Sequence, residues 1–157
     1  MRLCKPNNPH TLRRFLRVHG DDLPPSVLRT ATTKAELKNW IQFCDEQGIV
    51  AAAQVDPNDW YLCTIKNAGV RRDQRGKGYG RLLFRSVAEK ALALRTKEGH
   101  SRCHVLAADV TMDNVASIRS LHRAGFHQIN QFCWGKGEKP ADILHFVRVS
   151  PRNGKCE

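Results

Sequence analysis

Three glycines separate an apolar run from a helix-like run in the middle of the chain, and this arrangement constrains the fold more than any other feature. The apolar run extends from Tyr61 to Val70, and the glycines are Gly76, Gly78 and Gly80. Glycine permits a tight turn and lets a ligand approach bare N–H groups. The first turn of a helix has N–H groups without internal partners, and these attract phosphate. We therefore expect a strand, a phosphate-binding turn and a helix, in this order.

The residues around these glycines are mostly basic, and they exclude two familiar phosphate loops. The basic residues are Arg71, Arg72, Arg75, Lys77, Arg81 and Arg85, with Asp73 as the one acid. A P-loop requires Ser or Thr after Gly76-Lys77, where this chain has Gly78. A dinucleotide fingerprint requires a third glycine where this chain has Arg81. A glycine-rich turn with a solvated basic face remains the alternative.

A second block, from Val105 to Phe126, has the composition of a strand followed by a short helix. Asp113 or Asn114 can cap the start of that helix, and Gly125 can end it.

The rest of the chain predicts an alternation of strands and helices. We expect strands over Arg2–Cys4, Ile41–Cys44, Ile49–Val55, Tyr61–Val70, Arg102–Val110, His127–Trp134 and Ile143–Val149, and helices over His10–His19 and Gly78–Thr96. Asp21 to Pro25 is typical of a turn, and a capping box from Thr33 to Glu36 predicts a short helix towards Trp40.

Together the two blocks resemble the GCN5-related N-acetyltransferase (GNAT) family. Arg75, Gly78 and Gly80 match its R-x-x-G-x-G loop. The second block matches N-x-x-[AS]-x-x-x-[YL]-x-x-x-G-F at Asn114, Ser117, Leu121, Gly125 and Phe126. The resemblance implies an α/β (α+β) acyl-CoA N-acyltransferase fold, with a mixed, mostly antiparallel sheet of six or seven strands and about four helices.

The resemblance also implies acetyl-CoA as the acetyl donor and suggests which residues hold it. Backbone groups of Ala68, Gly69 and Val70 would bind the pantetheine arm. N–H groups of Arg75, Gly76, Lys77, Gly78, Tyr79, Gly80 and Arg81 would bind the pyrophosphate. Asn114 would reach the cofactor arm, with a plain helix cap as its alternative role. A backbone N–H near Val70 would stabilise the oxyanion.

The catalytic residues are less clear from the sequence. The family often has a tyrosine acid where this chain has Leu121. The adjacent His122 is a candidate substitute, although it points about 100° away on a helix. The central strand has no carboxylate to act as a base. Asp109, at the end of the following strand, is a candidate base, and a water held by backbone carbonyls is another.

Composition describes the chain's surroundings more than its fold. Its 157 residues fit one domain, which we expect over residues 1–150, followed by a tail over residues 151–157. The six cysteines form no C-x-x-C pair, and no signal peptide, membrane span or metal-ligand spacing is visible. We therefore expect a cytoplasmic, reduced protein without a metal; a homodimer stays open.

These observations lead to one function and two alternatives. The first is an enzyme that transfers acetyl from acetyl-CoA to a primary amine of a small molecule, a protein or an aminoacyl-RNA. The net charge of +11 could serve the cofactor, attract an acidic protein or RNA, or simply solvate the surface. The alternatives are therefore a basic nucleic-acid-binding module and a coenzyme-A-binding regulator without catalysis.

Overall fold

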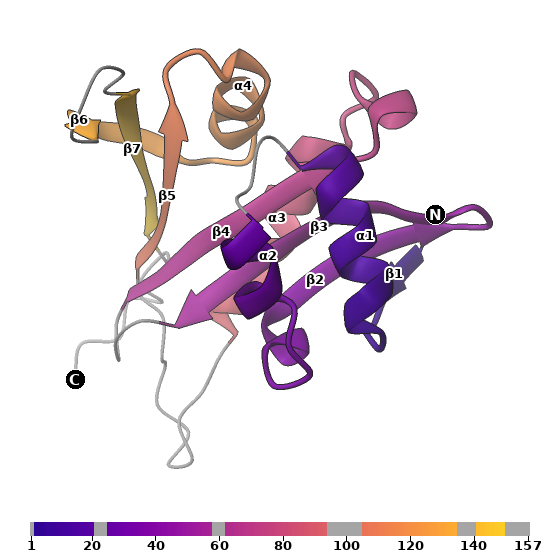
Figure 1. Ribbon diagram of the computed structural model, residues 1–157. Helices are drawn as coiled ribbons and strands as arrows, with labels where there is room; N and C mark the ends of the chain where they lie inside the picture. Colours follow the sequence, from indigo (N-terminus) through magenta and orange to yellow (C-terminus); the bar gives the residue numbers. More distant parts are fainter. Residues whose placement is uncertain (1, 21–24, 58–61, 94–104, 135–140, 150–157) are drawn as a thin grey trace, which may run out of the picture.

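The structure, a computed structural model, describes residues 2–20, 25–57, 62–93, 105–134 and 141–149 (Figure 1). Its elements follow the order β1 (Arg2–Cys4), α1 (Pro9–His19), α2 (Pro25–Ala31), η1 (Glu36–Asn39), β2 (Trp40–Asp45), β3 (Gly48–Pro57), β4 (Leu62–Val70), η2 (Arg72–Gln74), α3 (Tyr79–Leu92), β5 (Val105–Thr111), α4 (Val115–Arg123), β6 (His127–Trp134) and β7 (Ala141–Val149). Among these helices, none is long and apolar enough to cross a lipid bilayer.

The strands form one seven-stranded sheet in the order β1-β2-β3-β4-β5-β7-β6. All neighbouring pairs are antiparallel except β4 and β5, which run parallel. The connection between these two strands contains α3, as a parallel crossover requires. The predicted fold class, a mixed and mostly antiparallel sheet of six or seven strands with about four helices, is confirmed: the described residues form seven strands and four α-helices.

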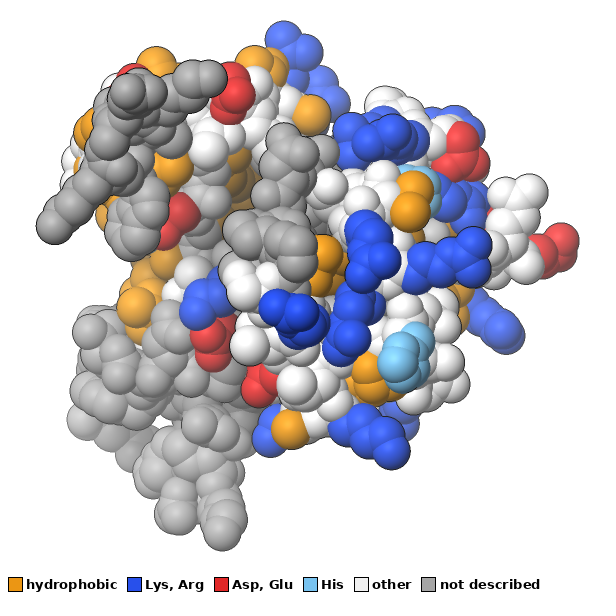
Figure 2. All heavy atoms as spheres, viewed as in Figure 1, with side chains coloured by type: hydrophobic (Ala, Val, Ile, Leu, Met, Phe, Trp, Pro, Cys, Tyr) orange, Lys and Arg blue, Asp and Glu red, His pale blue; other side chains and the backbone are white. Residues whose placement is uncertain are grey.

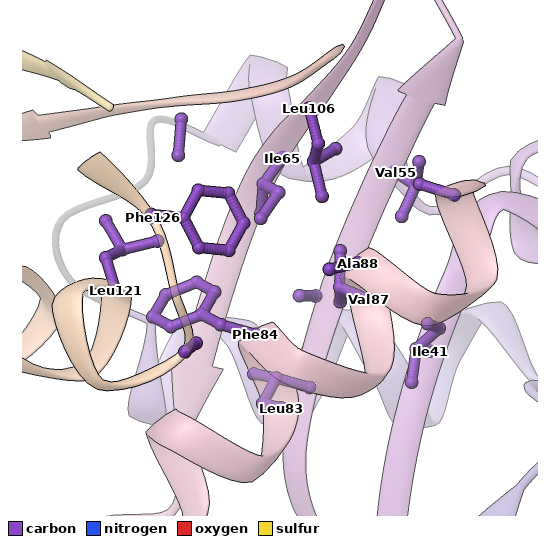
Figure 3. Close-up of a cluster of buried hydrophobic side chains, with 14 of the residues drawn as sticks. Ile41, Val55, Ile65, Leu83, Phe84, Val87, Ala88, Leu106, Leu121 and Phe126 are labelled. Atoms are coloured by element: carbon purple, nitrogen blue, oxygen red, sulfur yellow. The ribbon is translucent and has the colours of Figure 1, made fainter. Parts of the chain in front are cut away.

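The two faces of the sheet are covered by different helices. On β3, Ala51 and Ala53 belong to one buried cluster while Ala52 belongs to another, because alternate residues of a strand point to opposite faces. The larger cluster joins the sheet to α3 and α4, and Figure 3 shows Phe84 and Leu121 of these helices turned towards it. The smaller cluster lies under α1 and α2, which cross the near face of the sheet in Figure 1.

Two neighbouring strands separate part-way along their length, and this opening positions the site. Residues Leu62–Ile65 of β4 pair with Val105–Ala108 of β5, and the pairing ends there. Beyond that point β4 stays with β3 up to Val70, whereas β5 stays with β7 up to Thr111. Figure 1 shows the two strands diverging towards the ends that carry α3 and α4.

The structure differs from the expected elements between α1 and β2. Pro25–Ala31 forms a helix that the sequence analysis did not assign, beginning with a proline whose fixed φ suits the first turn. The Trp40 indole N–H donates to the Ala31 carbonyl at 2.8 Å and anchors the end of this helix.

Only one of the two hydrogen bonds of the predicted capping box is present. The Glu36 N–H donates to the Thr33 hydroxyl at 3.3 Å, but the Glu36 carboxylate binds Asn39 and Gln54 instead of returning to Thr33. The result is a short 3₁₀ turn instead of an α-helix. Some expectations lie outside the described residues: those for Tyr61, for residues 94–104 and for the tail at 151–157.

Candidate functional site

A cavity of about 310 Å³ lies where β4 and β5 separate, and we call it the β4–β5 cleft. Its walls are Ile65–Ala68 of β4 and Ala108–Thr111 of β5, with residues of α3 and α4 closing one side. Three residues predicted for the site line it: Ala68, Asp109 and Asn114. The divergence of the two strands therefore brings residues of both sequence blocks to one cavity.

Beyond the end of β4, the glycine loop turns the chain into α3. Gly76 and Gly78 have φ values of 77° and 86°, in the left-handed region that side chains disfavour. Gly80 is required for a different reason, because a Cβ there would lie 2.8 Å from the Ser120 hydroxyl oxygen of α4. The glycines thus allow the turn and the close approach of the two helices.

This loop leaves a row of backbone donors free at the start of α3. Among the described residues, the N–H groups of residues 76–81 have no recorded acceptor, and the first helical bond runs from Leu82 N–H to the Gly78 carbonyl. The N–H of Arg75 is already used, since it donates to the Arg72 carbonyl. A consecutive run of free N–H groups at a helix start favours an anion.

The Arg75 side chain fixes the loop to α1. Its guanidinium donates to the Val70 carbonyl at 3.2 Å and to the His19 carbonyl at 2.9 Å. Gly69 forms an isolated bridge with Gly20, and a Cβ at Gly69 would point towards Phe15 of α1. Gly69 therefore faces α1, and it is not among the residues that line the cleft. Of the three residues expected to hold the pantetheine arm, only Ala68 lines the cleft.

A histidine completes this junction between α1 and the loop. The Arg72 N–H donates to Nδ1 of His19 at 3.4 Å. Burial lowers the pKa of His19 below its ordinary value, and the nearby guanidinium of Arg72 lowers it further. The neutral imidazole is the form that can accept this bond, so both effects favour the observed contact.

A side-chain network holds the wall of the cleft at Asn67. The pairing of β3 with β4 shifts here, and Asn67 has φ of 51° although it is not glycine. Its amide donates to Gln54 at 2.8 Å, and Gln54 donates to the Glu36 carboxylate at 3.0 Å. Gln54 is buried, so the network fixes a kink in β4 next to the cleft.

The second sequence block forms α4 at the other side of the cleft. The Asn114 side chain accepts the Ser117 N–H at 3.1 Å, so it caps the helix, and both residues line the cleft. Leu121 also lines it with an apolar side chain. His122 packs edge-on against Phe146 at 5.1 Å and is not among the residues that line the cleft.

A histidine that the sequence analysis did not select lies beside Asp109. Nδ1 of His145 on β7 is 2.5 Å from the Asp109 carboxylate on β5. The two residues are direct partners in the antiparallel pairing of these strands. They are 36 positions apart in the chain, and only the strand register could have indicated the pair.

Comparison with known proteins identifies the family of the chain. The model of the acetyltransferase (GNAT) family matches residues 9–126. No curated protein sequence matches the chain.

Solved structures show a similar fold. A ribosomal-protein-alanine N-acetyltransferase from Brucella melitensis is 18% identical with a TM-score of 0.70, covering 96% of this chain and 100% of its own. NAA60 from Arabidopsis thaliana, solved with a bisubstrate analogue, is 16% identical with a TM-score of 0.70, covering 94% and 98%. YncA from Salmonella typhimurium, a putative acetyltransferase solved with acetyl-CoA, is 15% identical with a TM-score of 0.68, covering 99% and 97%.

At these identities the solved structures establish a shared fold, and the family assignment rests on the model match. That match covers the larger part of the chain and includes both the glycine loop and the Asn114 block. The chain therefore belongs to the acetyltransferase (GNAT) family, whose members are acetyl-CoA-dependent N-acetyltransferases.

Proposed function

We propose that this protein transfers the acetyl group of acetyl-CoA to a primary amine by direct attack of the amine. The observation that carries the proposal is the row of free N–H groups at residues 76–81, which follows, after the short turn η2, the strand that forms one wall of the β4–β5 cleft. A diphosphate needs several donors at a positive helix end, and a thioester arm needs a slot between strands. The two lie next to each other here.

The family resemblance assigns roles to the residues in this arrangement. The N–H groups of Gly76 to Arg81 bind the pyrophosphate, while the Arg75 side chain holds the loop against α1. The backbone of Ala68, which lines the cleft, binds the pantetheine arm, together with Gly69 and Val70 on the same strand. Asn114 shapes the opposite wall and contacts the arm.

The acceptor amine needs a group that removes its proton. Among the described residues, Asp109 is the one carboxylate that lines the cleft. We therefore assign proton removal to Asp109 and the residues in contact with it. His122 packs against Phe146 and does not line the cleft, so it has no part in this mechanism. Leu121 cannot protonate the leaving sulfur, but a thiolate can leave without an acid because its conjugate thiol is fairly acidic.

Two measurements test this proposal in sequence. Isothermal titration calorimetry with acetyl-CoA should show saturable binding at one site per chain; no heat of binding would overturn the proposal. A thiol-release assay over a panel of amines should then show turnover with at least one class. The panel should contain polyamines, peptides with a free N-terminus, lysine peptides and aminoacyl-RNA. Binding without turnover would identify a coenzyme-A-binding regulator instead.

A basic nucleic-acid-binding module is the second candidate, favoured by one surface. Figure 2 shows Lys and Arg side chains gathered over the face that carries α1 and α2. Exposed members on these helices are Arg14, Arg17 and Arg29. Because phosphate neutralisation releases counterions, polynucleotide affinity should fall steeply with salt if this surface binds RNA. A polynucleotide affinity that does not change with salt would indicate that the positive charge serves acetyl-CoA binding and solubility instead.

A further inference from the structure

Asp109 and His145 lie on the same face of the sheet. Ala108 and Leu144 belong to the core under α3 and α4, so their strand neighbours Asp109 and His145 point to the opposite face. This is the face that α1 and α2 cover over the other half of the sheet. The pair therefore lies on the side from which a second substrate can approach without crossing α3 or α4.

The pair also lies where β4 and β5 separate. Ala108 is the last residue of β5 that pairs with β4, and Asp109 follows it directly. Asp109 lines the cleft, and His145 contacts Asp109 from the neighbouring strand. Both side chains remain accessible, with exposed fractions of 49% for Asp109 and 29% for His145. Asp109 therefore connects the imidazole of His145 to the cleft.

The contact selects one of the two imidazole nitrogens. A carboxylate accepts hydrogen bonds, so Nδ1 of His145 is the donor in the 2.5 Å contact. In the neutral ring, Nε2 then carries the lone pair. A carboxylate that orients an imidazole in this manner is an established arrangement for proton abstraction in unrelated enzymes.

We propose that His145 accepts the proton of the acceptor amine through Nε2 and that Asp109 positions it, an inference that rests on the acetyl transfer proposed above. The ammonium proton passes to Nε2, directly or through one water. The freed lone pair of the amine forms the N–C bond to the acetyl carbonyl carbon. The C–S bond breaks, its electron pair leaves on sulfur, and the second amine proton passes to the thiolate, directly or through water, as the amide forms.

Other titratable groups nearby do not take this role. Lys66 on β4 forms an ion pair with Asp56 at 2.5 Å and is itself a cation. His127 on β6 is opposite Val147 of β7, one pair further along the same face, and has no recorded carboxylate partner among the described residues. The Asp109–His145 pair is distinguished by the contact and by its place at the cleft.

Kinetic variants test the assignment against a structural role. His145→Gln should lower kcat by about 10²-fold or more, the range for loss of a general base, with little change in KM for acetyl-CoA. Asp109→Asn should lower kcat by about 10-fold to 100-fold, as expected for loss of an orienting partner, and shift the acidic limb of the pH–rate profile. The matched control, His127→Gln, should keep the wild-type rate and profile.

Two outcomes would overturn the proposal. If His145→Gln retains the acidic limb and most of kcat while Asp109→Asn loses both, Asp109 is the base. If both variants lose thermal stability in proportion to their loss of rate, the pair is structural. Calorimetry should show that both variants bind acetyl-CoA with wild-type affinity. If the wild-type protein itself does not bind acetyl-CoA, the proposed function is wrong, and not only the role of this pair.

The position of the hydrogen on the His145 ring can be measured without an acceptor amine, so it tests the proposal even if no amine in the panel reacts. Two-bond ¹H–¹⁵N spectra of the uniformly labelled protein report which nitrogen of each neutral imidazole carries hydrogen. The His145 signals, assigned through His145→Gln, should show hydrogen on Nδ1, and Asp109→Asn should weaken that preference. Hydrogen on Nε2 in the wild-type protein would overturn the proposal.

Discussion

The two walls of the β4–β5 cleft are built in different ways. Along β4 and the glycine loop that follows it, the groups that we propose bind the ligand are backbone atoms, with residues 76–81 supplying the free N–H donors. Along β5, the groups are side chains, and Asp109 gains its partner from a strand 36 residues away. A site made of backbone leaves a local glycine signature in the sequence, whereas a site made of paired side chains leaves none.

The largest effect is expected from a variant that disrupts the glycine loop. Gly78→Val places a β-branched residue at φ of 86°, which costs about 1–2 kcal/mol or more and moves the N–H groups out of line. We expect the affinity for acetyl-CoA to fall at least about tenfold, measured by calorimetry.

A second glycine provides the control for this variant. Gly48 also has a left-handed φ, 116°, and at both Gly48 and Gly78 an added Cβ would meet no heavy atom within 4 Å. Gly48→Val should therefore lose comparable stability and keep its affinity. Equal loss of affinity in both variants would show that the effect is global unfolding, not damage to the loop.

This contrast also explains what the sequence could predict. The strand, loop and helix around Gly78 were predicted because each signal lies within a few residues of the next, and α4 was predicted from its cap at Asn114. The helix at Pro25–Ala31 was missed because its stabilising contact is with Trp40, outside the helix. Glu36 was assigned to a local capping box, but its carboxylate binds Gln54 on a distant strand.

The same reason limits what the sequence says about the site. Asp109 was selected because a carboxylate at a strand end is visible in the sequence. His145 was not, because its pairing depends on the register of β5 with β7. Arg75 was expected to contribute its N–H to the ligand, while the structure uses that N–H in a turn and its side chain as an anchor.

The next variant tests whether a side chain supports the backbone wall. Asn67→Ala removes the hydrogen bond to Gln54 and keeps a side chain at φ of 51°. We expect a loss of about 1–3 kcal/mol in the free energy of unfolding, since buried Gln54 loses a partner. Asn67→Gly relieves the backbone cost and should lose less. Urea denaturation of both separates the two contributions; identical losses would contradict the role of the left-handed backbone.

A smaller effect is expected at the contact of α3 with α4, the two helices that close one side of the cleft. In Gly80→Ala the new methyl group would lie 2.8 Å from the Ser120 hydroxyl, which would have to rotate and lose its bond to the Ala116 carbonyl. We expect a destabilisation of about 1 kcal/mol. In a Ser120→Ala background the same change should cost less, because only the contact with the Cβ of residue 120 at 3.3 Å remains and alanine favours helix. Thermal denaturation of the four proteins checks this difference; additive effects would exclude the contact with the hydroxyl.

The smallest effect concerns the attachment of the loop to the sheet, and it depends on pH. Arg71 is buried and binds Asp45 at 2.5 Å and Asp73 at 2.9 Å. Hydrogen bonding from Arg71 lowers the pKa of Asp45 below its ordinary value of 3.8, and hydrogen bonds from Gln74 and then Arg71 lower that of Asp73.

A lowered folded-state pKa means that each carboxylate stabilises the folded chain above its ordinary value, and that this contribution is lost as the pH falls below it. The melting temperature of the wild-type protein should therefore fall as the pH drops below about 4, and that of Asp45→Asn should fall less. The variant should be the less stable protein near neutral pH, and the two curves should converge in acid. Parallel curves throughout would show that the Asp45–Arg71 pair does not hold the loop.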